Sequence, residues 1–169
     1  DNDGDGATDC SDSECAGPCA ALTCPAGQSL YWFSATGLPI PIPDLATATS
    51  TIAVPVSGTV KQTVLKLDIL HTWDSDVDIA LRSPTVAPID ISSDNGLSND
   101  NYTNTTFSDN CAMSITAGAA PYTGCYTPES PMAAFIGQPA SGTWTLQAID
   151  DASGLAGTLN SWKLTLCIQ

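Results

Sequence analysis

The sequence predicts an all-β fold, an antiparallel β-sandwich preceded by an irregular acidic segment. Apolar residues alternate with polar ones in several short segments, and turns rich in Ser, Asn, Gly and Pro separate these segments. No amphipathic helical repeat of useful length is present, and a single helical turn is expected around residues 131–135. Many short strands with such turns favour a sandwich, for which Greek-key connections are common.

Four segments show the alternation most clearly, and a period of two marks strands with one buried face. Their inward residues are Leu65, Leu67 and Ile69; Val77, Ile79 and Leu81; Trp144, Leu146 and Ala148; and Trp162, Leu164, Leu166 and Ile168. We therefore place Trp144 and Trp162 in the core. For Trp32 and Trp73 the sequence leaves open whether they belong to the core or to a carbohydrate-binding platform.

The charge balance excludes several classes of partner. The chain of 169 residues has 18 acidic and 4 basic residues, a net charge of −14, and is 43% hydrophobic. Such a chain repels phosphate backbones and anionic membranes, so we expect no nucleic acid partner. No apolar stretch approaches the roughly 20 residues of a membrane span. We interpret the sequence as a piece of a larger secreted or cell-surface protein.

Seven cysteines indicate an oxidising compartment. Cys111 and Cys125 bracket a loop with Gly and Pro, and we predict that they pair. Cys24 and Cys167 belong to the first and last strands, whose ends can meet in a sandwich, and they are the second predicted pair. The odd count leaves a free thiol or a partner outside this chain. The N-terminal cluster lacks the Cys-x-x-Cys spacing of a zinc ribbon; it comprises Cys10, Cys15, Cys19 and Cys24.

Residues 1–20 are predicted to form a separate calcium-binding loop. Asp1, Asp3, Asp5, Asp9 and Asp12 occupy the ligand positions of an EF-hand-type loop, Gly6 permits its sharp turn, and Ala7 offers a backbone carbonyl. This run resembles a thrombospondin type 3 repeat or a dockerin-like loop, although Asp12 replaces the usual Glu. The alternative is an acidic tail without metal.

More acids gather inside the sandwich segment. Asp74, Asp76 and Asp78 crowd the start of one strand, and Asp100 and Asp109 flank an Asn/Thr-rich loop. Carboxylates this close repel one another unless a cation or water intervenes, which predicts a second calcium site. The alternative is a solvated acidic rim.

The single histidine, His71, shares the parity of the inward residues, so we predict a buried, hydrogen-bonded, structural role. No sequence neighbourhood of a Ser-His-Asp triad is present.

Residues 43–168 resemble the P-domain that follows the catalytic domain of kexin- and furin-like proprotein convertases and of many secreted bacterial proteases. The resemblance is carried by IPD (42–44), LDILHTWDSDVDIALRSP (67–84), NDNYTNTTFSD (99–109), PYTGCYTPE (121–129) and the run from 132 to 166. It implies a jelly-roll-like sandwich of about eight strands over residues 21–169 that stabilises a neighbouring catalytic domain. It also implies that Asp76, Asp100 and Asp109 bind calcium, with Asn101 a weaker candidate and Asp78 facing solvent. Leu155 departs from the bacterial pattern, which often has an acid there.

These observations predict a non-catalytic, calcium-binding accessory module that stabilises or anchors a neighbouring domain such as a subtilisin-like protease. The alternative is an extracellular adhesion or self-assembly module, with a homo-oligomer or a surface ligand as its partner. An autonomous enzyme has no catalytic constellation to support it.

Overall fold

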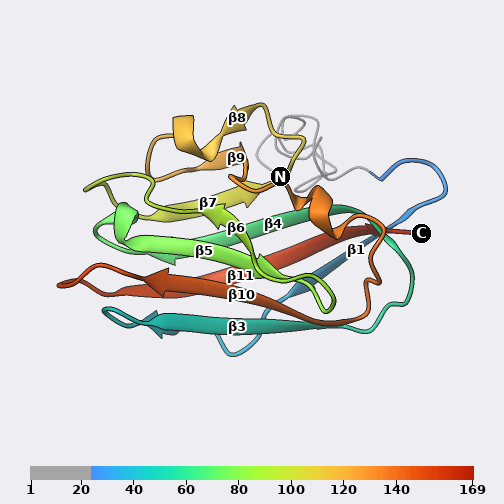
Figure 1. Ribbon diagram of the computed structural model, residues 1–169, viewed down its shortest axis with the longest axis horizontal. Helices are drawn as coiled ribbons and strands as arrows, with labels where there is room; N and C mark the ends of the chain where they lie inside the picture. Colours follow the sequence, from blue (N-terminus) through green and yellow to red (C-terminus); the bar gives the residue numbers. More distant parts are fainter. Residues whose placement is uncertain (1–23) are drawn as a thin grey trace, which may run out of the picture.

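Two β-sheets packed face to face form the domain (Figure 1), and the computed structural model describes residues 24–169. The larger sheet has the strand order β1-β11-β4-β7-β9-β8, with β2 also pairing with β11, and the smaller has the order β3-β10-β5-β6. The larger sheet contains β1 (Ser29–Ser34), β2 (Ile40–Ile42), β4 (Val60–Leu70), β7 (Tyr102–Phe107), β8 (Met113–Ser114), β9 (Gly124–Thr127) and β11 (Gly157–Ile168). The smaller contains β3 (Thr47–Val54), β5 (Val77–Arg82), β6 (Ile89–Ser92) and β10 (Gly142–Asp150). Three 3-10 turns complete the described residues: η4 (Asp74–Asp76), η5 (Ile115–Ala117) and η6 (Met132–Phe135).

The all-β sandwich predicted from the sequence is confirmed, and so are its four clearest strands and the helical turn at η6. The described residues contain eleven strands, more than the resemblance implied, because short strands such as β2 and β8 add to the sheet margins. Most pairs are antiparallel, but β9 runs parallel to both β7 and β8. Parallel pairs require crossover connections, which a local sequence pattern does not reveal.

The centre of the larger sheet is the antiparallel pair of β4 and β11, the two longest strands. From Leu65 to Leu70 of β4 and from Ser161 to Leu164 of β11, buried apolar residues alternate with more exposed ones, as a strand with one buried face requires, whereas the last five residues of β11 are all buried. On its other side β11 pairs with both β1 and β2. This strand therefore holds three others in place.

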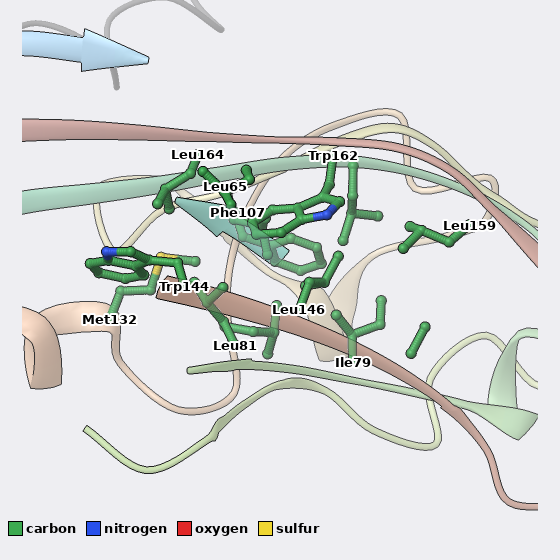
Figure 2. Packing of buried hydrophobic residues seen from close by; sticks show 14 of the residues in the cluster. Leu65, Ile79, Leu81, Phe107, Met132, Trp144, Leu146, Leu159, Trp162 and Leu164 are labelled. Carbon is green, nitrogen blue, oxygen red and sulfur yellow. The ribbon is translucent and has the colours of Figure 1, made fainter. Parts of the chain in front are cut away.

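Figure 2 shows the core between the two sheets, where side chains of β4 and β11 meet those of β5 and β10. Trp144 and Trp162 are buried, as predicted, with 0% and 2% of their surface exposed. The Trp162 Nε1–H donates to Ser50 Oγ on β3 at 2.8 Å and so connects the two sheets. The Trp144 Nε1–H donates to the Ala140 carbonyl at 2.9 Å. Both indoles thus bury their rings without leaving an unpaired donor.

Both predicted disulfides are present. Cys24 bonds to Cys167 of β11 across 143 positions of sequence, and Cys111 bonds to Cys125 of β9 across 14. The first ties the segment before β1 to the last strand, and the second fixes the crossover that leads into the parallel strand β9. Closing the longer loop removes more chain entropy from the unfolded state.

Two leucines of β4 test the assignment of the buried face. Leu67 is 1% exposed and Leu70 is 49% exposed. We expect Leu67→Ala to lower the free energy of unfolding by about 2–5 kcal/mol, because it leaves a cavity in the core. Leu70→Ala should change it by less than about 0.5 kcal/mol. Urea unfolding of the two variants measures both values, and equal losses would contradict the assigned faces.

Candidate metal site

Seven aspartates gather at one end of the sandwich, on the left in Figure 1. They come from η4, the start of β5, the single loop between β6 and β7, and the end of β10. We call this group the acidic end; its members are Asp74, Asp76, Asp78, Asp94, Asp100, Asp150 and Asp151. Among the ionisable residues that shift the pKa values of Asp74 and Asp76, only His71 can carry a positive charge, and those that shift the pKa of Asp78 are all acids.

A buried histidine–aspartate pair supports this end. His71 follows β4 and Asp150 ends β10, so the contact joins the two sheets. The distance from His71 Nε2 to Asp150 Oδ2 is 3.2 Å, and both side chains are fully buried. His71 Nδ1 lies 2.8 Å from the Trp73 carbonyl and 3.2 Å from the Trp73 amide. The prediction of a buried, hydrogen-bonded histidine is confirmed, and no ring nitrogen is left to activate a nucleophile.

The imidazole fits closely against the backbone of β11. A Cβ atom built on Gly157 would lie 2.6 Å from His71 Cδ2 and 2.6 Å from the Leu70 carbonyl oxygen. Only glycine leaves room for the ring at this point. The first residue of β11 therefore helps to set the position of His71.

Asp74 is the least satisfied group of the acidic end. The residue is completely buried, and neither carboxylate oxygen has a hydrogen-bond partner among the described residues. Its backbone N–H donates to the Asn99 carbonyl at 2.8 Å. Gly96 packs directly against it, because a Cβ at Gly96 would lie 2.6 Å from Asp74 Cβ. The side chain is thus held in place without being neutralised.

The pKa of Asp74 is raised to about 7, mainly by burial and also by the nearby charge of Asp100. The Asn101 amide and His71 act in the opposite direction. The Asn101 backbone N–H donates its hydrogen bond to the His71 carbonyl, at 3.0 Å, and not to an Asp74 oxygen. Among the described residues, an ionised Asp74 therefore has neither an ion pair nor a hydrogen bond to its carboxylate.

Asp76 and Asp78 experience the same repulsion. Burial raises the pKa of Asp76, and so do Asp150 and Asp151, while His71 lowers it. Burial also raises the pKa of Asp78, with contributions from Asp151 and Asp94. Asp78 is half-buried and its Oδ1 has no partner, so the expectation that it simply faces solvent is wrong.

The structure does not bring Asp100 and Asp109 together. The segment interpreted as an Asn/Thr-rich loop is strand β7, and the two acids lie before and after it, at opposite ends. The Asp109 oxygens accept hydrogen bonds from the amides of Met132 at 2.8 Å and Ala133 at 2.7 Å, at the start of η6. Asp76, Asp100 and Asp109 therefore do not form one site. Binding of metal by any one of them stays a prediction.

Asp100 does lie near Asp74, which the sequence analysis had not chosen as a ligand. Within residues 24–169, no three side chains of His, Cys, Asp or Glu form a group ready to hold a metal ion. A cation here would be held by Asp74 and Asp100, with carbonyl or water oxygens completing its shell, as Ca²⁺ accepts. The predicted ligands Asp1, Asp3, Asp5, Ala7, Asp9 and Asp12 lie outside the described residues.

The fold and the acidic end define a disulfide-linked β-sandwich module in which a buried His–Asp pair joins the sheets. Residues 60–166, well over half of the chain, match the family described as the proprotein convertase P-domain. The chain belongs to this family. No curated protein sequence matches it.

Solved structures share the fold at low sequence identity. A serine protease of Aeromonas sobria is 19% identical, with a TM-score of 0.55, over 89% of this chain and 29% of the protease. The same protease in complex with its chaperone ORF2 gives a TM-score of 0.55 and 19% identity, over 89% of this chain and 28% of the other. The structure named FLHE is 14% identical, with a TM-score of 0.52, over 85% of this chain and 99% of its own. The chain thus spans less than a third of the protease it resembles.

The two disulfides indicate an oxidising compartment. In the part of the chain that the structure describes, no helix has the length and apolar character to cross a membrane.

The buried Asp74 predicts an unusual dependence of stability on pH. Its pKa is about 7 in the folded state and 3.8 as the ordinary value, so between these limits the folded state binds a proton that the unfolded state has lost. In EDTA, the free energy of unfolding should therefore fall as pH rises from about 4 to about 7, by on the order of a few kcal/mol. The raised pKa values of Asp76 and Asp78 act in the same direction.

Urea unfolding between these pH values measures the slope. Asp74→Asn should flatten it, whereas Asp44→Asn, which removes an exposed carboxylate, should leave it unchanged. An equal slope in Asp74→Asn and the wild type would show that Asp74 does not take up this proton.

Proposed function

We propose that this chain is a non-catalytic accessory module that stabilises an adjoining secreted protease domain and binds calcium. The observation that carries the first part is the P-domain family match over residues 60–166. The sandwich also has the fold of a portion of a serine protease. The His71 ring, engaged at both nitrogens, supports a structural role for the one histidine of the chain.

Two features support calcium. Asp74 is a fully buried carboxylate with neither oxygen paired, and Asp100 lies beside it. A bound divalent cation would neutralise both and return Asp74 to its ionised form. The second feature is the Asp-rich spacing of residues 1–12, which supplies EF-hand-type ligand positions. Calcium in both places would act structurally, by holding turns together.

The calcium proposal is tested by thermal unfolding in calcium and in EDTA. A cation that binds only the folded form, at about 100 times its Kd, adds roughly 2.7 kcal/mol. For a domain of this size the melting temperature should rise by about 5–10 °C. Asp74→Asn should abolish this response and, in EDTA, should melt no lower than the wild type, because it removes a buried charge. Asp109→Asn, a matched loss of one carboxylate at the other end of β7, should keep the response.

Calorimetry separates the two sites. Asp3→Ala should remove one bound calcium ion while the melting temperature of the sandwich barely changes. If calcium leaves the melting curve of the wild type unchanged and no ion is detected, both calcium sites are refuted.

The accessory role is tested on the polypeptide that carries this sequence. Expression without residues 24–169 should yield an adjoining protease domain that melts at a lower temperature and loses activity faster on heating. The isolated chain should not hydrolyse casein. An unchanged protease domain after the deletion would contradict stabilisation, and casein hydrolysis that His71→Gln abolishes in folded protein would contradict a non-catalytic role.

A further inference from the structure

The outer face of the larger sheet concentrates positive charge in a strongly acidic protein. Its residues come from β1, β11, β4 and β7, and their side chains point away from the core. We call this surface the lysine face; it comprises Trp32, Ser34, Lys66, Asn104, Ser161 and Lys163. It contains two of the four basic residues of the chain. All six residues are exposed.

The two lysines are direct neighbours across the strands. Lys66 of β4 is the register partner of Lys163 of β11. Like charges in this position destabilise a sheet. Within residues 24–169 the only ion pair is His71–Asp150, so neither ammonium group has a carboxylate within 4.0 Å. The pair therefore offers two unneutralised positive charges to a ligand.

The one acid next to them on this face is already engaged. Asp68 follows Lys66 by two positions on β4 and so points to the same side. Its oxygens accept hydrogen bonds from the Asn104 amide at 3.2 Å and from Asn160 Nδ2 at 2.9 Å. Asp68 thus fixes the strand end rather than neutralising the lysines.

An exposed indole lies beside the lysines. Trp32 is 64% exposed, in contrast to the two buried tryptophans of the core. Lys163 Nζ lies 5.1 Å from the centre of its ring, a cation–π contact that orients both side chains. A shallow cavity of about 220 Å³ adjoins them, lined by Ser34, Asn104, Ser161 and both lysines. Ammonium groups, hydroxyls and an amide therefore line one depression, and the exposed Trp32 ring lies next to it through its contact with Lys163.

This combination fits a sugar ring that carries a carboxylate. The ammonium groups match the acid, the hydroxyl and amide groups match sugar hydroxyls, and the indole packs against the apolar C–H face of a pyranose. A peptide would fit less well, because the backbone groups of β4 and β11 beneath the face are already paired within the sheet and cannot accept an added strand.

The acidic end does not cancel this attraction. Lys66 precedes Leu70, at the end of β4, by four positions, or about 13 Å at the rise of a strand. That distance exceeds the Debye length of about 8 Å at physiological ionic strength, so the aspartates beyond Leu70 are largely screened from the lysine face.

From these contacts we propose that the lysine face binds a carboxylate-bearing carbohydrate, with Lys66 and Lys163 pairing with the acid and Trp32 stacking on the ring. This surface is separate from the acidic end, and the proposal does not depend on calcium or on the accessory role. It assigns the exposed Trp32 to ligand binding.

The test is calorimetric titration of the whole chain, in EDTA, with trigalacturonic acid, trimannuronic acid and the neutral trisaccharide galactotriose. At least one acid should bind, and galactotriose should bind at least about tenfold more weakly. Each of three variants should raise the Kd for the acidic trisaccharide by about fivefold or more: Lys66→Gln, Lys163→Gln and Trp32→Ala. Lys61→Gln makes the same change of charge on the same strand, and its Kd for the acidic trisaccharide should stay within about twofold of the wild-type value.

Three results would overturn the proposal. The first is that neither acid binds. The second is that Lys61→Gln weakens binding as much as Lys66→Gln, which would indicate general attraction to positive charge. The third is that a hexa-aspartate peptide binds as tightly as the acidic trisaccharides, which would assign the face to acidic peptides. Trp32, Lys66 and Lys163 are exposed and Lys61 is half-buried, so each variant is expected to keep the melting temperature of the wild type.

Discussion

The contact between His71 and Asp150 determines how one end of the molecule is built. It joins the end of β4 in the larger sheet to the end of β10 in the smaller one, with both side chains fully buried. The same imidazole contacts the Trp73 backbone and so fixes the start of the turn that contains Asp74 and Asp76. Removing one partner of such a pair leaves a buried polar group unsatisfied, which costs more than the contact itself contributes. The arrangement of the acidic end therefore depends on this pair.

The charges of the protein are segregated by the fold. Seven aspartates occupy one end, while Lys66 and Lys163 lie together on the outer face of the larger sheet. Neither group neutralises the other, and among the described residues a single ion pair is formed. Attraction between the two groups therefore adds little to stability, and the core and the disulfides must supply it. Because the charges are separated, the acidic end is free to bind cations and the lysine face is free to bind anions.

Period-two alternation was sufficient to predict the strands that carry Leu67, Ile79 and Trp162, because one face of each is buried. The alternation could not predict that Asp74 is buried, because a residue in a 3-10 turn has no strand parity. The burial of Asp74 depends on the loop at Gly96, which is distant in sequence. The grouping of Asp100 with Asp109 failed for a related reason. The polar segment between them is a strand because it pairs with β4 on one side and β9 on the other, and these partners are distant in sequence.

The position of β11 has a consequence for how the protein is made. This strand pairs with β1, β2 and β4, yet it is translated after all of them. A nascent chain that has emerged only as far as β10 contains β1 and β2 without their partner, and the inner face of β4 is only partly covered. Contacts this distant in sequence make folding slow, and the exposed apolar strands promote aggregation in the meantime. The sandwich is thus a late-closing structure, and β4 must remain accessible until residues 157–168 leave the ribosome.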